Sequence, residues 1–291
     1  MELVISLPPP NPALHALVIQ LGAGGKGNGI SATGLKQRLP FGAAQGPPPA
    51  LGQAIHAQVM QWLNLGDSHL ATAIHSSQNS PLSISGLLGC RRQEGIKPGD
   101  DFYFRVALLH GDLLNPLLNG MEQWGTKPLF LGQYPFVIRS VDSMPGTHPW
   151  VGAAEYGLLA ESPRISGDIT LNFVSPTSFK QRQDIQPFPL PELVFGNLWR
   201  RWNTFTPVEL QFPVIDWHGL TSAYELKTHA LKMESGTEIG AKGWVRYRFL
   251  DPEQLKIATV LAHFAFFSGV GRKTAMGMGQ VRLLSESQKL D

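Results

Sequence analysis

The stretch that decides the fold lies near the C-terminus: residues 267–280, which read FSGVGRKTAMGMGQ. Its four glycines form two G-x-G pairs, and Arg272 and Lys273 stand between the pairs. Glycine lacks a side chain and tolerates positive φ, so such a loop can bring backbone N–H groups close to an anion. The pattern therefore indicates either a phosphate-binding loop or a tight turn with a solvated Arg-Lys tip.

The segments around this loop predict a regular order of elements. Asp251 and Pro252 suit the N-cap and first position of a helix, which is apolar nearly all round until residue 267 and should be buried. A short strand is expected at 280–284. Upstream, the patterns predict a strand at 165–173, a helix at 193–202, and strands at 224–233 and 244–250.

The first half of the chain repeats this order. The patterns predict a strand at 14–21, helices at 51–75 with the second from residue 68, strands at 81–88 and 102–109, a helix at 113–121 and a strand at 129–141. Two β-α-β-β-α-β units predict an α+β fold of two tandem ferredoxin-like modules with a C-terminal glycine-rich loop. We place the modules at 1–145 and 146–291, because Pro145, Gly146 and Pro149 cluster at the boundary. A Gly/Pro-rich insert at 22–50 interrupts the first module.

Composition narrows the class of protein. With 291 residues and 43% hydrophobic content, each module can bury a core of its own. The single cysteine, Cys90, excludes an internal disulfide and a multi-cysteine metal site. No signal peptide or membrane-spanning segment is visible, so we expect a cytoplasmic protein.

Two other glycine patterns do not indicate a nucleotide site. Residues 22–27 fit G-x-G-x-x-G, but no helix pattern follows at once and no acidic residue occurs in the next 39 positions to bind a ribose. The segment 271–274 departs from a P-loop in spacing and in the order of helix and loop. A nucleotide-binding metabolic enzyme remains the weaker alternative.

Histidines and basic residues supply the candidate site. None of the nine histidines has metal-ligand spacing. His75 ends the second predicted helix, where the helix dipole favours a cation, and His56 faces outward near the start of the first. Each is either a surface histidine or a functional one. Arg200 and Arg201, between two tryptophans, are either a solvated helix face or a basic surface of the kind that binds RNA.

Three blocks together resemble one family, the CRISPR-associated family-six endoribonucleases of the RAMP superfamily. The strongest is 267–280, which is similar to the family's glycine-rich signature. The second runs from 175–180 (SPTSFK) to 198–203 (LWRRWN), and the third from 70–75 (LATAIH) to 80–85 (SPLSIS). The resemblance covers nearly the whole chain, although the insert at 22–50 has no counterpart.

The resemblance implies an enzyme that cuts CRISPR repeat transcripts into guide RNAs without a metal or other cofactor. The ribose 2′-OH would attack the phosphate, giving a 2′,3′-cyclic phosphate and a 5′-OH. His75 takes the position of the family's catalytic histidine, and His56 is the second candidate. The chain departs from the family in having no Lys, Arg or Tyr at 76–89, so Lys36, Arg38, Arg91 or Arg92 would have to stabilise the developing charge.

The expected partner is CRISPR repeat RNA, with other CRISPR effector subunits as further partners, no membrane, and a monomer or homodimer as the protein. A non-catalytic RNA-binding subunit of an effector complex is the alternative. The residues expected to bind RNA are Lys36, Arg38, Lys180, Arg182, Arg200, Arg201, Gly269, Gly271, Arg272, Lys273, Gly277 and Gly279.

Overall fold

The structure, a computed structural model, describes residues 11–24, 51–89, 96–132, 134–163, 165, 167–233 and 236–284. The first module is built from β1 (Ala13–Ala23), α1 (Gly52–Gly66), α2 (Ser68–Ser76), β2 (Leu82–Ile84), β3 (Leu88–Gly89), β4 (Asp101–Leu108), η1 (Gly111–Leu113), α3 (Leu114–Trp124), β5 (Leu129–Leu131) and β6 (Tyr134–Asp142). Its sheet has the order β2-β4-β1-β6-β5, and every pairing along this path is antiparallel.

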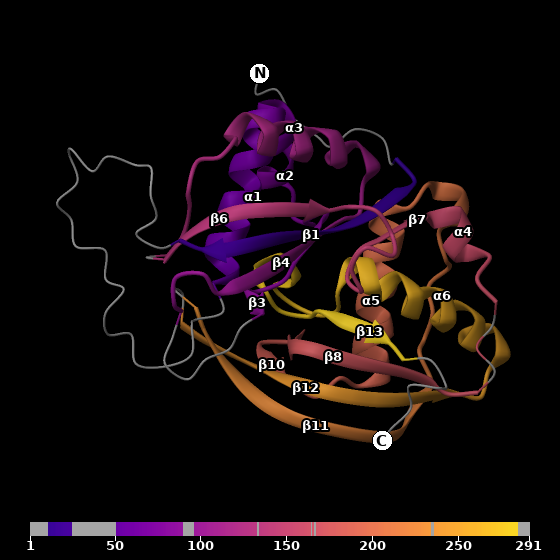
Figure 1. The fold of residues 1–291 in the computed structure, drawn as a ribbon. Coiled ribbons are helices and arrows are strands. Elements are labelled where there is room, and N and C mark those ends of the chain that lie inside the picture. The colour runs from indigo at the N-terminus through magenta and orange to yellow at the C-terminus, as the bar shows by residue number, and fades with distance from the viewer. Residues whose placement is uncertain are drawn as a thin grey trace, which may run out of the picture.

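The second module repeats this arrangement with β8 (Ile169–Thr177), α5 (Pro191–Phe205), β11 (Gly219–Met233), β12 (Gly236–Phe249), α6 (Pro252–Ser268) and β13 (Val281–Leu283). Its sheet order is β11-β12-β8-β13. In both modules the third strand of the unit pairs with the second and the first, and the fourth strand lies beside the first. The predicted pair of ferredoxin-like modules is confirmed, and Figure 1 shows the two sheets one above the other.

Local signals placed several elements well. Asp251 caps α6 by accepting hydrogen bonds from the N–H groups of Glu253 and Gln254, at 2.8 and 3.4 Å. The helix is buried on most sides, as predicted. β1 is buried on both faces around the apolar run 16–19. Leu17 packs under the helices of its own module, and Val18 packs against Trp150 on the other face.

Other predicted bounds were wrong. Gly132, with φ of 61°, breaks the single strand predicted at 129–141 into the β5–β6 hairpin. β8 begins at Ile169 rather than residue 165, and β11 and β12 are longer than predicted. The short elements β7 (Gly152–Glu155), α4 (Tyr156–Ala160), η2 (Val208–Leu210), η3 (Thr274–Met276) and the hairpin of β9 (Phe179–Gln181) and β10 (Asp184–Gln186) were not predicted.

The division between the modules at 145/146 stays a prediction. β7 follows that boundary in sequence but pairs with β1 of the first sheet, from Ala13↔Glu155 to Ala16↔Gly152. The linker segment therefore contributes a strand to the module that precedes it.

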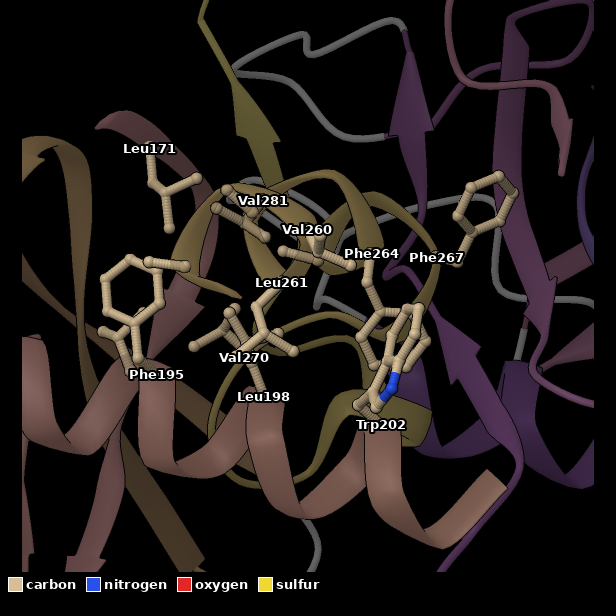
Figure 2. Packing of buried hydrophobic residues seen from close by; sticks show 14 of the residues in the cluster. Leu171, Phe195, Leu198, Trp202, Val260, Leu261, Phe264, Phe267, Val270 and Val281 are labelled. Atoms are coloured by element: carbon tan, nitrogen blue, oxygen red, sulfur yellow. The ribbon is translucent and has the colours of Figure 1, made fainter. Parts of the chain in front are cut away.

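Each module has a large hydrophobic cluster. In the second, helices α5 and α6 cover one face of the sheet, and Figure 2 shows side chains of both helices interleaved with Leu171 and Val281 of the strands. Full burial of one such aliphatic or aromatic side chain stabilises a fold by about 1.5–3 kcal/mol. In the first module, α1, α2 and α3 supply the helical side of the cluster.

A buried arginine links the two modules. Arg105 on β4 donates to the carbonyls of Trp150 (3.1 Å) and Phe266 (2.6 Å) and to Oε1 of Gln280 (3.1 Å). The guanidinium also lies over the Phe266 ring, 4.5 Å from its centroid. Burial, and then the positive charge of Arg282, lowers the pKa of Arg105 to about 9, so it stays a cation at neutral pH.

Candidate functional site

Two parts of the first module meet the glycine-rich loop 269–280: the start of α1 and the end of β2. Gly52 packs so closely on the loop that an added Cβ would collide with the Met276 carbonyl oxygen. The N–H of Gly277 donates to the Ile84 carbonyl at 3.0 Å, and Gly277 forms a parallel bridge with Ser85. In Figure 1 the yellow C-terminal segment accordingly lies against the purple elements of the first module.

His56 lies at this junction, and His75 lies close enough for its charge to act on His56. His56 is on α1 one turn after Gly52 and is half-buried, whereas His75 is exposed in the last turn of α2. Burial lowers the pKa of His56, and the positive charge of His75 lowers it further. The two candidate histidines, 19 positions apart in sequence, are therefore close enough in space for their charges to interact.

The local sequence fixes where His75 stands. The Asp67 side chain caps α2 by accepting from the N–H of Leu70 at 2.9 Å, so the helix begins at Ser68. It ends where the N–H of Ser77 donates to the carbonyls of Ala73 and Ile74. His75 thus occupies the last turn, where a cation is favoured by the helix dipole.

The glycine-rich loop contacts both modules, and most of its described N–H groups donate hydrogen bonds within the protein. Val270 belongs to the core of the second module, and Ala275 to that of the first. The N–H groups of Gly271 and Arg272 donate to Asn197 Oδ1 (2.8 Å) and the Ser178 carbonyl (2.9 Å), and that of Gly279 donates to the Pro176 carbonyl (3.1 Å). These donors do not form the open N–H cradle that the spacing suggested.

The glycines are nevertheless required by geometry. Gly269, Gly271, Gly277 and Gly279 all have positive φ, between 65° and 97°. A Cβ at Gly271 would collide with the Ser178 carbonyl oxygen, and one at Gly279 with that of Val270. The two blocks that resemble the family, 175–180 and 267–280, thus pack directly on each other. The RNA-binding role expected of these four glycines stays a prediction.

Arg272 and Lys273 do not stand alone at the tip of the loop. Both pair with Glu238 of β12, at 2.9 Å from Arg272 Nη1 and 2.7 Å from Lys273 Nζ. Hydrogen bonding to Lys273 and the nearby positive charges lower the pKa of Glu238. The cluster is partly buried and carries two positive charges and one negative charge. Sequence reasoning missed Glu238, because 34 positions separate it from Arg272.

The adjacent arginines of α5 face different surroundings. Arg200 is exposed, as the predicted basic surface requires. Arg201 points inward: its Nη2 lies 3.4 Å from the Ser80 carbonyl, and its guanidinium lies over Phe205. Burial lowers the pKa of Arg201 to about 10. Arg201 is therefore a contact between α5 and the segment that follows His75.

The remaining predicted residues are dispersed. Lys180 and Arg182 are exposed on the β9–β10 hairpin, where Arg182 has φ of 56°. Lys36, Arg38, Arg91 and Arg92 lie outside the described residues, as does most of the insert at 22–50. Within the described part of the chain, no group of three or more His, Cys, Asp and Glu side chains could hold a metal ion, and no helix is long and apolar enough to cross a membrane.

The fold and this junction define the class: a protein of two tandem ferredoxin-like modules that are joined by a glycine-rich loop. The sequence model of the family described as CRISPR-associated endoribonuclease Cas6 matches residues 171–281. A CRISPR-associated endoribonuclease Cas6 of Streptococcus thermophilus is 26% identical over 117 residues, which are 38% of this chain and 48% of that protein. The matched stretch thus spans about half the length of the curated relative.

Solved structures extend the likeness to nearly the whole chain. A Cas6 product complex matches with a TM-score of 0.75 and 24% identity, covering 93% of this chain and all of the other. Thermus thermophilus Cas6 matches with a TM-score of 0.65 and 21% identity, covering 93% of this chain and 98% of the other. These structural matches show the fold. Together with the family match, they confirm the resemblance to the CRISPR-associated family-six endoribonucleases, known as Cas6.

Proposed function

We propose that this chain is an endoribonuclease that cleaves CRISPR repeat transcripts into guide RNAs without a metal ion. The observation that carries the proposal is the interaction between the charges of His56 and His75, in a chain with the Cas6 fold. His56 lies one turn after Gly52, which packs on the glycine-rich loop. Two neighbouring imidazoles provide what internal RNA cleavage needs, a proton acceptor and a proton donor.

The surroundings of the two histidines suggest their roles. His56 has a lowered pKa and is neutral at pH 7, so it suits the base. His75 is exposed in the last turn of α2, so we assign it the role of the acid. The 2′-oxygen forms a bond to phosphorus while its proton passes to His56. The bond from phosphorus to the 5′-oxygen then breaks as that oxygen takes a proton from His75. The products are a 2′,3′-cyclic phosphate and a 5′-OH.

Arg201 is our candidate for stabilising the charge on the reacting phosphate. Its guanidinium is a cation at neutral pH and reaches the Ser80 carbonyl, five positions after His75. Burial in a low-dielectric site strengthens such an interaction with a developing negative charge. Arg201 would thus supply the cation that residues 76–89 lack.

RNA binding is assigned to cations spread over the second module. Arg272 and Lys273 on the loop, Arg200 on α5, and Lys180 and Arg182 on the β9–β10 hairpin would contact backbone phosphates. Gly269, Gly271, Gly277 and Gly279 would contribute by allowing the loop its close packing, and Lys36 and Arg38 by the charge of the insert.

Incubation with a cognate repeat RNA in EDTA tests the proposal. We expect one cut per repeat, with a 5′-OH on the downstream fragment. Tight binding without cleavage would instead support the non-catalytic subunit of an effector complex. Genomic position beside a repeat array would supply the RNA sequence for the assay.

A further inference from the structure

Glu238 lies at the tip end of the long β11–β12 hairpin, where that hairpin meets the glycine-rich loop. Its two carboxylate oxygens engage different cations: Oε2 accepts from Arg272 Nη1 at 2.9 Å, and Oε1 pairs with Lys273 Nζ at 2.7 Å. The Lys273 Nζ also lies 3.5 Å from Met233 Sδ, on the other strand of the hairpin. One hairpin therefore fixes both cationic side chains of the loop.

The charges of this cluster do not cancel. Two cations share one carboxylate, which leaves a net positive charge. The exposed side-chain fractions are 29% for Arg272 and 21% for Lys273, so both still reach solvent. A guanidinium has five N–H donors, and Arg272 uses its Nη1 to bind Glu238. The cluster can thus keep Glu238 and accept an additional anion.

The backbone conformation of Lys273 also supports a functional role for this cluster. Its φ of 53° lies in the left-handed region, which costs a residue other than glycine about 1–2 kcal/mol. Glycine occupies the other positions of this loop that have positive φ, namely 269, 271, 277 and 279. At position 273 the chain instead bears a side chain, whose Nζ pairs with Glu238 Oε1. Strain of this kind is typical of functional positions.

We propose that Glu238 is a positioning residue, which holds Arg272 and Lys273 in one orientation so that together they bind a phosphate of the RNA backbone. This inference rests on the proposed function, because it takes RNA as the ligand. Preorganisation is the physical reason: two long side chains that are already ordered lose less rotamer entropy when the phosphate binds.

The test asks whether removing the charge of Glu238 weakens or strengthens RNA binding. Removing an acidic residue beside an RNA site should strengthen binding if charge alone matters. We expect Glu238→Gln to weaken binding of repeat RNA by about three- to tenfold, a change in binding free energy of about 0.7–1.4 kcal/mol. The slope of log Kd against log salt should also flatten by about 0.7 for each phosphate of single-stranded RNA that the variant no longer neutralises. Fluorescence anisotropy of labelled RNA measures both, in a His75→Ala background that limits cleavage.

Two controls separate positioning from a loss of structure. Asp168→Asn also removes an acid of the second module that is paired with an arginine, Arg248 at 2.8 Å, but far from the loop in sequence; it should not weaken binding more than about twofold. In a background of Arg272→Ala and Lys273→Ala, Glu238→Gln should have no further weakening effect, because a positioning residue acts only through its partners.

Each outcome supports or overturns the inference. Tighter or unchanged binding by Glu238→Gln would overturn it, as would an equal loss in both backgrounds, which would indicate a general structural defect. If the parent protein binds no repeat RNA, the proposed function itself fails and this inference falls with it. If the parent binds and only the Glu238 result differs, the inference alone is wrong.

Discussion

His56 and His75 have the same side chain in different surroundings. His56 is half-buried on α1, and its pKa is lowered by burial and by the charge of His75. His75 is exposed at the end of α2. Acid-base catalysis needs a proton acceptor and a proton donor, and we assign these two roles to the two positions. The proposed mechanism therefore needs both His56 and His75.

Alanine variants test that assignment at the residue scale. We expect His75→Ala and His56→Ala each to reduce the single-turnover cleavage rate by about 10²–10⁴-fold, the usual contribution of proton transfer. His69→Ala is the matched control, because His69 is exposed on the same helix as His75. A His75 variant that cuts at the parent rate would remove His75 from the mechanism.

Sequence reasoning could find His75 from its place at a helix end and from the resemblance to a family. It could not show that the charges of His56 and His75 interact, because their proximity depends on how α1 and α2 pack. Glu238 was missed for the same reason, because only the folded β11–β12 hairpin places it next to Arg272 and Lys273. Arg201 was expected on the surface, and only the packing of α5 against the Ser80 segment turns it inward.

At the scale of elements, the glycine-rich loop connects α6 to β13 while inserting into both modules. Spacing could predict that the loop needs glycines, but not that Asn197, Ser178 and Pro176 accept its N–H groups. Long periodic segments such as α6 were predicted closely. The short hairpin β9–β10 and the break at Gly132 were missed, because strand patterns of three residues carry little signal.

Two glycine variants distinguish the cost of a steric collision of the new Cβ from the cost of backbone strain alone. Gly271→Ala should destabilise the fold by more than Gly146→Ala, which should cost about 1 kcal/mol of strain. Both residues have positive φ, 86° and 92°, but a Cβ at 271 meets the Ser178 carbonyl. Apart from its chain neighbours, no atom of the described residues lies within 4 Å of a Cβ at 146. Urea denaturation followed by circular dichroism gives both values. Equal destabilisation would contradict the close packing of the loop.

At the scale of the whole molecule, Arg105 should act as a structural link between the modules. Arg105→Met removes the donors for the buried carbonyls of Trp150 and Phe266 and for Gln280. Each buried acceptor left without a partner costs about 1–3 kcal/mol, so we expect a large fall in the free energy of unfolding. Thermal unfolding compared with Arg248→Met, an exposed arginine, checks this. Similar melting temperatures would contradict the role of Arg105.

The overall stability should also depend on pH. Burial lowers the pKa of His15, His56, His148 and His263 below the ordinary value of 6.5. In the window from 6.5 down to those lowered values, the unfolded chain binds more protons than the folded one. The free energy of unfolding should therefore fall as the pH drops below 6.5. Unfolding measured from pH 7.5 to 5 at constant ionic strength tests this, and a stability that stays level or rises on acidification would contradict it.

The predicted order of elements was sufficient to identify two ferredoxin-like modules, because each module repeats one pattern of strands and helices. The sequence could not show how the modules are joined. That junction depends on Arg105, Gln280 and the loop, whose contacts span up to 197 positions. The candidate site lies at the same junction, so its geometry could not be derived from local patterns.

The most direct measurement compares two repeat RNAs that differ by one oxygen. The first is all-ribose, and the second has a 2′-deoxy nucleotide immediately upstream of the scissile phosphate. In EDTA, we predict that the protein binds both with similar affinity, cuts the first to leave a 2′,3′-cyclic phosphate and a 5′-OH, and leaves the second intact at that site. Cleavage of the 2′-deoxy RNA at that site, or no cleavage of either RNA, would contradict the proposed 2′-OH mechanism.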